Sequence, residues 1–180
     1  MYKAEQLIEV LRDADSRGYI GEAVSQLEHG LQAAHFASQA CKDEEVILAC
    51  LFHDIGHLCA DEDAEQMDWA GVADHENLGA QILKEAGFSE RVAELVASHV
   101  NAKRYLASKD GYCENLSPAS LLTLEHQGGK MDADEAESFR NHEDFKNYLL
   151  VRACDDKAKV VDLEVAGLDH YIEMVHRHIG

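Results

Sequence analysis

The residues best suited to chemistry in this chain are histidines and aspartates beside apolar runs. His53 and Asp54 are adjacent within L-F-H-D-I-G-H, residues 51–57. Two neighbouring polar side chains in an apolar segment cost free energy unless something satisfies them, and a metal ion would do so. Imidazole and carboxylate together suit iron, manganese or zinc. The candidate ligands, in chain order, are His29, His53, Asp54, His75, His99 and Asp155.

The size of this set predicts two metal ions, because six ligands exceed the needs of one tetrahedral centre. Asp54 is the natural bridge, since a carboxylate has two oxygens and its neighbour His53 is also a ligand. We assign one ion to His29, His53, Asp54 and Asp155. The other takes Asp54, His75 and His99, with positions left open for substrate and for oxygen or water.

A lone histidine is more often a hydrogen-bonded core or surface residue than a ligand, so the ordered series carries this prediction. Spacing does not choose between Asp155 and its neighbour Asp156. Five other histidines lack apolar flanks or a place in the ligand series, and we expect them at the surface: His126, His142, His170, His176 and His178.

Apolar residues recur at helical spacing along the chain, and no alternating strand pattern occurs. The single proline, Pro118, suits a helical protein. We predict an all-α fold, one helical bundle over residues 1–180, with an acidic loop at 61–71. Helices are expected over 3–14 and 22–40, from Asp43 to a stop near Gly56, over 74–86, from Ser89 through Val100, over 117–125, from Asp132 or Asp134, and over 142–159 and 168–178.

The composition narrows the possible partners. The net charge is −19, which argues against nucleic-acid backbones and anionic membranes. Five cysteines, an odd number without a C-x-x-C pair, favour a reducing cytosol. No signal peptide or membrane-spanning run is evident. We therefore expect a cytoplasmic protein that binds a small molecule.

The ordered ligand series resembles the HD-domain superfamily of metal-dependent phosphohydrolases, in the branch with two metals. It is more closely similar to the PhnZ-type mixed-valent di-iron oxygenases, which cleave the carbon–phosphorus bond of 1-hydroxyphosphonates. This resemblance implies two iron ions, Fe(II)/Fe(III), with O2 as co-substrate, and it selects Asp155 as the ligand. The stretches that carry it lie at 19–29, 51–57, 74–80, 87–93, 98–106, 123–132 and 151–157.

The resemblance also implies roles for residues around the metals. Tyr19 and Glu22 would form a lid, in which Tyr19 ligates the second iron until substrate displaces it. Glu22 would then meet the cationic nitrogen of the substrate. The residues that match the phosphonate-binding positions are His57, Lys103, Ser120 and Arg152.

Helical phasing supports part of this set, since His57 lies four residues after His53 and Lys103 four after His99. The role of Gln127 stays open. For Trp69 we favour packing over a loop rather than cation–π contact with a substrate.

The expected function is oxidative cleavage of (1-hydroxy-2-aminoethyl)phosphonate to glycine and inorganic phosphate. Alternatives are the N-trimethylated substrate giving glycine betaine, and a metal-dependent phosphohydrolase. A displaceable phenolate such as Tyr19 is not needed for hydrolysis, which favours the oxygenase. An inositol-type di-iron oxygenase is disfavoured by the phosphonate-binding set, and a degenerate sensor domain by the intact ligand series.

Overall fold

The computed structural model describes residues 2–19, 21–61 and 63–180. Ile20, within the 19–29 stretch, and Glu62, within the predicted acidic loop, lie outside the described residues, as does Met1. The described residues form ten α-helices and two short 3-10 helices, and their β-structure is limited to the isolated bridges Gly18–Ser25 and Gln66–Val72. The predicted all-α class is therefore confirmed.

The α-helices run, in order, α1 (Ala4–Asp13), α2 (Gln26–Ala40), α3 (Glu44–Phe52), α4 (Ile55–Cys59), α5 (His75–Glu85), α6 (Glu90–Ala107), α7 (Pro118–His126), α8 (Ala133–Arg140), α9 (Phe145–Lys157) and α10 (Leu168–Ile179). The 3-10 helices are η1 (Ala14–Ser16) and η2 (Cys113–Asn115).

Capping residues explain where several helices begin. Ser25 accepts a hydrogen bond from the Glu28 N–H while the Glu28 carboxylate accepts one from the Ser25 N–H, a reciprocal capping box. The helix predicted from 22 therefore starts only at Gln26, which leaves Glu22 in the preceding loop. Likewise, the helix predicted over 142–159 spans only Phe145–Lys157.

The His53-Asp54 pair occupies a break between two helices, not the helix interior that the apolar pattern suggested. α3 ends at Phe52 and α4 begins at Ile55, with Asp54 at φ −101° and ψ 10°. Gly56 is also not a helix stop, because it lies inside α4. A Cβ at this position would lie 2.0 Å from the carbonyl oxygen of His75, so glycine permits the close approach of α4 to α5.

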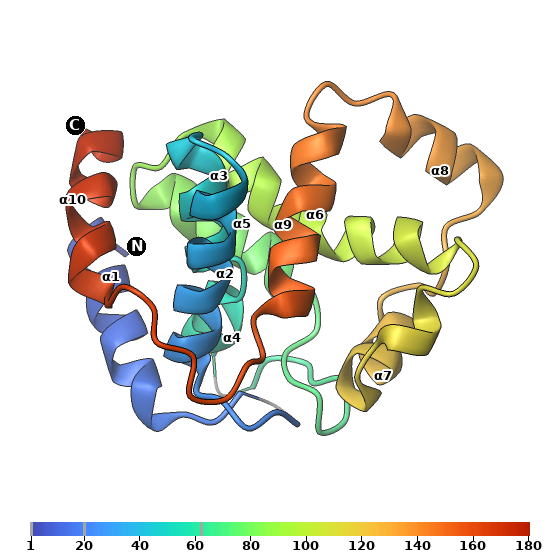
Figure 1. Ribbon diagram of the computed structural model, residues 1–180, viewed down its shortest axis with the longest axis horizontal. Coiled ribbons are helices and arrows are strands. Elements are labelled where there is room, and N and C mark those ends of the chain that lie inside the picture. Colours follow the sequence, from blue (N-terminus) through green and yellow to red (C-terminus); the bar gives the residue numbers. More distant parts are fainter. Residues whose placement is uncertain (1, 20, 62) are drawn as a thin grey trace.

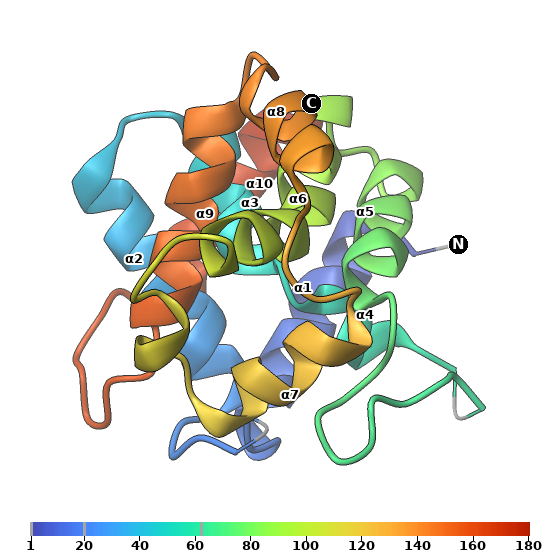
Figure 2. The same cartoon turned by 90° about the vertical axis from the view of Figure 1, so that its right-hand side faces the viewer.

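The helices that carry the candidate ligands form the centre of the molecule (Figure 1). α2 packs against α3 and α9, while α6 packs against α5, α3 and α9. A continuous apolar core joins these helices to α1 and α10, the latter contributing Leu168, Tyr171 and Val175. α7 and α8 lie at the opposite end from α1 and α10, and Figure 2 shows α7 crossing below the ends of the central helices.

No helix among the described residues is both long enough and apolar enough to cross a bilayer.

Candidate metal centre and substrate pocket

Four buried histidine rings turn the same edge toward one another. Nδ1 of each lies within hydrogen-bond distance of a backbone carbonyl: 2.8 Å for His29 to Ala158, 2.8 Å for His53 to Cys50, 3.2 Å for His75 to Val72, and 2.7 Å for His99 to Val96. A carbonyl oxygen only accepts, so each Nδ1 carries a proton and the neutral ring keeps its lone pair on Nε2. This is the orientation that metal-binding histidines adopt.

The Nε2 atoms form two close pairs, 3.0 Å apart for His29 and His53 and 3.2 Å apart for His75 and His99. Lone pairs at this separation repel, so each pair calls for a proton or a metal ion. Asp54 lies between the pairs. Its Oδ2 is 3.8 Å and 3.5 Å from Nε2 of His29 and His53, and its Oδ1 is 3.5 Å and 3.8 Å from Nε2 of His75 and His99.

Asp155 completes the first group, with Oδ1 3.3 Å from His29 Nε2 and 3.7 Å from His53 Nε2. Its neighbour Asp156 instead contacts Arg152 and Tyr112. The structure thus brings the six predicted ligands together, with one carboxylate facing both histidine pairs. Nitrogen and oxygen donors without a thiolate fit two metal ions of the iron, manganese or zinc kind.

The surroundings of the two buried carboxylates keep them ionised. Burial would raise the pKa of Asp54 and of Asp155, but neighbouring histidines, and Arg152 beside Asp155, lower both pKa values well below the ordinary range. For His53, burial acts in the opposite direction and lowers the pKa, but the charges of Asp54 and Asp155 outweigh burial and raise that pKa to about 9. Protons and a metal ion would therefore compete for Nε2 of His53.

His57 differs from the four histidines in its tautomer. The Val72 N–H donates to His57 Nδ1 over 3.1 Å, so the ring proton must be on Nε2. The ring stacks on His75 at 3.8 Å, and its Nε2–H can donate to a ligand in the pocket rather than bind a metal. Burial and the nearby His75 lower the pKa of His57 to about 3, which keeps the ring neutral.

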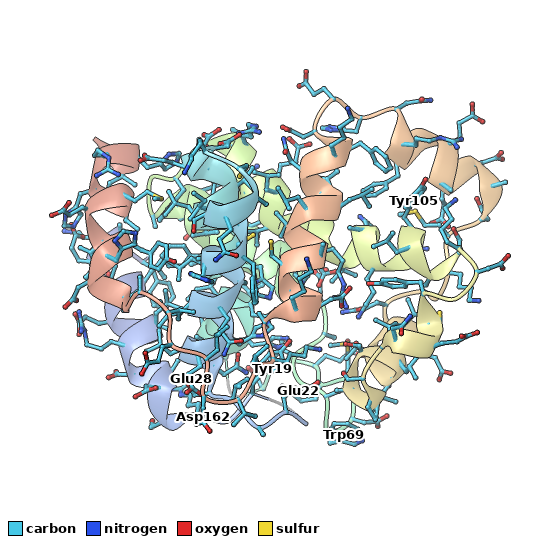
Figure 3. All side chains as sticks on the ribbon, in the orientation of Figure 1. Tyr19, Glu22, Glu28, Trp69, Tyr105 and Asp162 are labelled. Carbon is cyan, nitrogen blue, oxygen red and sulfur yellow. The ribbon has the colours of Figure 1, made fainter. Side chains whose placement is uncertain are left out.

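Tyr19 and Glu22 lie together at one edge of the bundle, below the end of α9 (Figure 3). The Tyr19 ring stacks on His29 at 3.8 Å, next to the metal centre. Burial, followed by the charges of Asp54 and Asp155, raises the pKa of its phenol well above 10. Trp69 is 56% exposed, yet its ring lies beside the loop that contains Gly21: a Cβ on Gly21 would be 3.2 Å from it.

A pocket with a free volume of about 50 Å³ opens onto the metal centre. The predicted residues Tyr19, Glu22, His57, Lys103, Ser120 and Arg152 all line it. Lys103 is 3% exposed and donates to Thr123 Oγ1 over 2.8 Å. Burial and the nearby Arg152 lower the pKa of Lys103 to about 7.

Arg152 is held from three sides. Its guanidinium donates to Asp155 over 2.6 Å, to the Tyr112 hydroxyl over 3.0 Å and to Asp156. Although burial opposes it, the charges of Asp155 and Asp156 raise the pKa of Arg152. The pocket therefore contains a permanent cation beside the metal centre.

Sequence reasoning missed several residues here. Tyr112 and Asp156 orient Arg152, and Thr123 orients Lys103. Lys159 lines the pocket from the segment after α9 and forms an ion pair with Glu22, at 3.3 Å. Only Asp156 had a signal, its position next to Asp155. Gln127, whose role stayed open, lies in the pocket wall.

The histidines expected at the surface lie outside the metal centre. His126, His170 and His176 are exposed, whereas His142 and His178 are partly buried. His126 forms an ion pair with Asp68 at 3.1 Å, and His142 with Glu94 at 3.1 Å.

Comparison with known proteins agrees with this arrangement. The model of the HD domain matches residues 27–164. The chain is 39% identical to the [1-hydroxy-2-(trimethylamino)ethyl]phosphonate dioxygenase (glycine-betaine-forming) of Leisingera caerulea, over 92% of this chain and 86% of that protein. It is 40% identical to the hydroxymethylphosphonate dioxygenase of Gimesia maris, over 94% of this chain and 84% of that protein. The chain belongs to the HD-domain family and, within it, to the PhnZ-type oxygenases.

Proposed function

We propose that the protein uses O2 to cleave the carbon–phosphorus bond of (1-hydroxy-2-aminoethyl)phosphonate, giving glycine and inorganic phosphate. The observation that carries this proposal is Asp54 facing two histidine pairs beneath a pocket lined by cations. The relatives named as phosphonate dioxygenases support the reaction class. One O2 per substrate balances the atoms, since both of its oxygens are retained in the two products.

Two iron ions, the proposed cofactors, would be held by His29, His53, Asp54, His75, His99 and Asp155, with Tyr19 as a displaceable ligand. When bound, they would supply the redox chemistry that activates O2. The protein contributes position and charge. His57 donates from Nε2, Lys103 and Arg152 supply positive charge, and Ser120 supplies a hydroxyl at the phosphonate end.

The nitrogen end of the substrate would face Glu22. The N-trimethylated substrate, which would give glycine betaine, is the alternative. It remains in the test because the Leisingera caerulea relative is named for it.

We further propose that residues 1–180 form a single domain and that the protein works in the cytoplasm. One apolar core that includes residues of both α1 and α10 supports the first proposal. All five cysteines are free in the described structure, as a reducing compartment would keep them. The net charge of −19 supports a small-molecule partner rather than a nucleic acid or an anionic membrane.

The test is to load the protein with iron and incubate it with each hydroxylated phosphonate, with and without O2. Phosphate together with glycine or glycine betaine should form only with O2. The Asp54→Ala variant is the control, because it removes the shared carboxylate. Phosphate release from phosphate esters without O2, and none from phosphonates, would instead identify a phosphohydrolase.

A further inference from the structure

Lys159 already occupies the place at Glu22 that a substrate cation would need. Its Nζ lies 3.3 Å from Glu22 Oε1 and 5.8 Å from the centre of the Tyr19 ring. It also lies 3.5 Å from both Ser117 Oγ and Ser120 Oγ. The side chain is 16% exposed and that of Glu22 is 18% exposed, so the pair is partly shielded from water. Lys159 thus lies between the nitrogen end and the phosphonate end of the pocket.

Two buried acceptor oxygens in this part of the pocket receive no hydrogen bond. Lys159 makes a charge contact with Glu22 Oε1, but this buried oxygen receives no aligned hydrogen bond. Oε1 of Gln127, in the same pocket wall, is also buried without a partner. Buried acceptors without donors are costly, and a ligand that brings N–H groups would relieve that cost. A primary ammonium has three such donors, whereas a quaternary ammonium has none.

We infer that Lys159 is a specificity-determining residue that competes with the substrate's ammonium group for Glu22. A phosphonate without nitrogen leaves the Lys159–Glu22 pair intact. A phosphonate with a primary ammonium must displace Lys159, because two cations cannot share the single carboxylate without repulsion.

This inference rests on the proposed function, so its test separates the two. The probes are (2-aminoethyl)phosphonate and propylphosphonate, which have the same length and differ by an ammonium in place of a methyl group. Neither has a 1-hydroxyl group, so the iron-loaded protein can be titrated by calorimetry under anaerobic conditions without turnover. The measured quantity is the ratio of the two dissociation constants, from which effects common to both phosphonates cancel.

Lys159→Met should shift this ratio in favour of (2-aminoethyl)phosphonate by up to about fivefold, the upper end of the range expected for loss of one partly exposed charge contact. Lys159→Arg, which restores the cation, should return the ratio to the wild-type value. In a Glu22→Gln background Lys159→Met should leave the ratio unchanged. Lys157→Met is the matched control, because Lys157 is exposed and lies outside the pocket.

If both probes bind and Lys159→Met leaves their ratio unchanged or shifts it toward propylphosphonate, the competition is refuted while the proposed function stands. If neither probe binds the wild-type protein, the competition is refuted, and the proposed function is judged separately by O2-dependent phosphate release from the 1-hydroxylated phosphonates. Thermal unfolding of each variant shows whether the fold is intact. Lys159→Gln replaces Lys159→Met if the latter does not fold.

Discussion

Replacement of Gly56 by alanine should damage both the fold and the metal centre. The added Cβ would lie 2.0 Å from the His75 carbonyl oxygen, 2.8 Å from its carbonyl carbon and 3.0 Å from the Gly79 nitrogen. Cβ atoms essentially never approach other heavy atoms closer than 3.0 Å, so α4 and α5 would have to separate by about 1 Å. Overpacking of this kind against backbone atoms should lower the free energy of unfolding by about 2–3 kcal/mol.

The same displacement would separate two proposed ligands. Asp54 precedes α4 and His75 begins α5, and their nearest oxygen and nitrogen atoms are now 3.5 Å apart. Metal–ligand distances tolerate changes of only about 0.2 Å, so a shift of about 1 Å should remove at least one ion.

The assay is urea unfolding of the metal-free variant, followed by iron analysis of the loaded protein. Gly167→Ala is the control, because its Cβ would meet nothing within 4 Å, and it should cost no more than about 1 kcal/mol as the loss of a glycine N-cap. A Gly56→Ala protein with wild-type stability and two bound irons would refute the reasoning.

Three further predictions follow from the site and its supports. The pKa of Lys103 is lowered to about 7, so its side chain is charged below that pH and neutral above it. We expect kcat/KM for a phosphonate to fall as pH rises through about 7, and the Lys103→Met variant should not show this fall. His53 has its pKa raised to about 9 and must lose its proton to bind metal, so iron affinity should weaken as pH falls below 9. Iron affinity can be measured by competition with a chelator, and an affinity that stays constant between pH 6 and 9 would disprove this. Ser25→Ala removes one half of the α2 capping box and should cost about 1 kcal/mol in chemical unfolding, whereas an unchanged midpoint would show that the cap is dispensable.

The sequence was a good guide to which segments are helical, because apolar spacing reports directly on the buried face of a helix. It was a poorer guide to helix ends. The run from Glu22 to Ala40 looks continuous, yet the Ser25–Glu28 capping box starts the helix at Gln26. Gly56 resembled a helix stop because glycine serves both helix ends and close backbone contacts, and only the position of His75 distinguishes these uses.

The metal centre was more predictable than the pocket. Five of the six proposed ligands are residue types with few uses in an apolar environment, so type and order were enough to select them. The family resemblance was needed to select Asp155 over Asp156. Tyr112 and Lys159 act through partners distant in the chain, and lysine or tyrosine near a helix end has many ordinary explanations. The Lys159–Glu22 pair joins segments 137 residues apart, and no local pattern indicates such a contact.

The pocket also explains how a chain with a net charge of −19 can hold an anion. Three carboxylates line it, those of Glu22, Asp54 and Asp155, and three basic side chains oppose them, those of Lys103, Arg152 and Lys159. These charges balance, so the protein alone has little excess positive charge to offer a phosphonate. The excess must come from the metal ions, which makes anion binding depend on metal binding. A cationic substrate nitrogen that displaces Lys159 would keep Glu22 neutralised, so the carboxylate would not lose its counter-charge when the substrate binds.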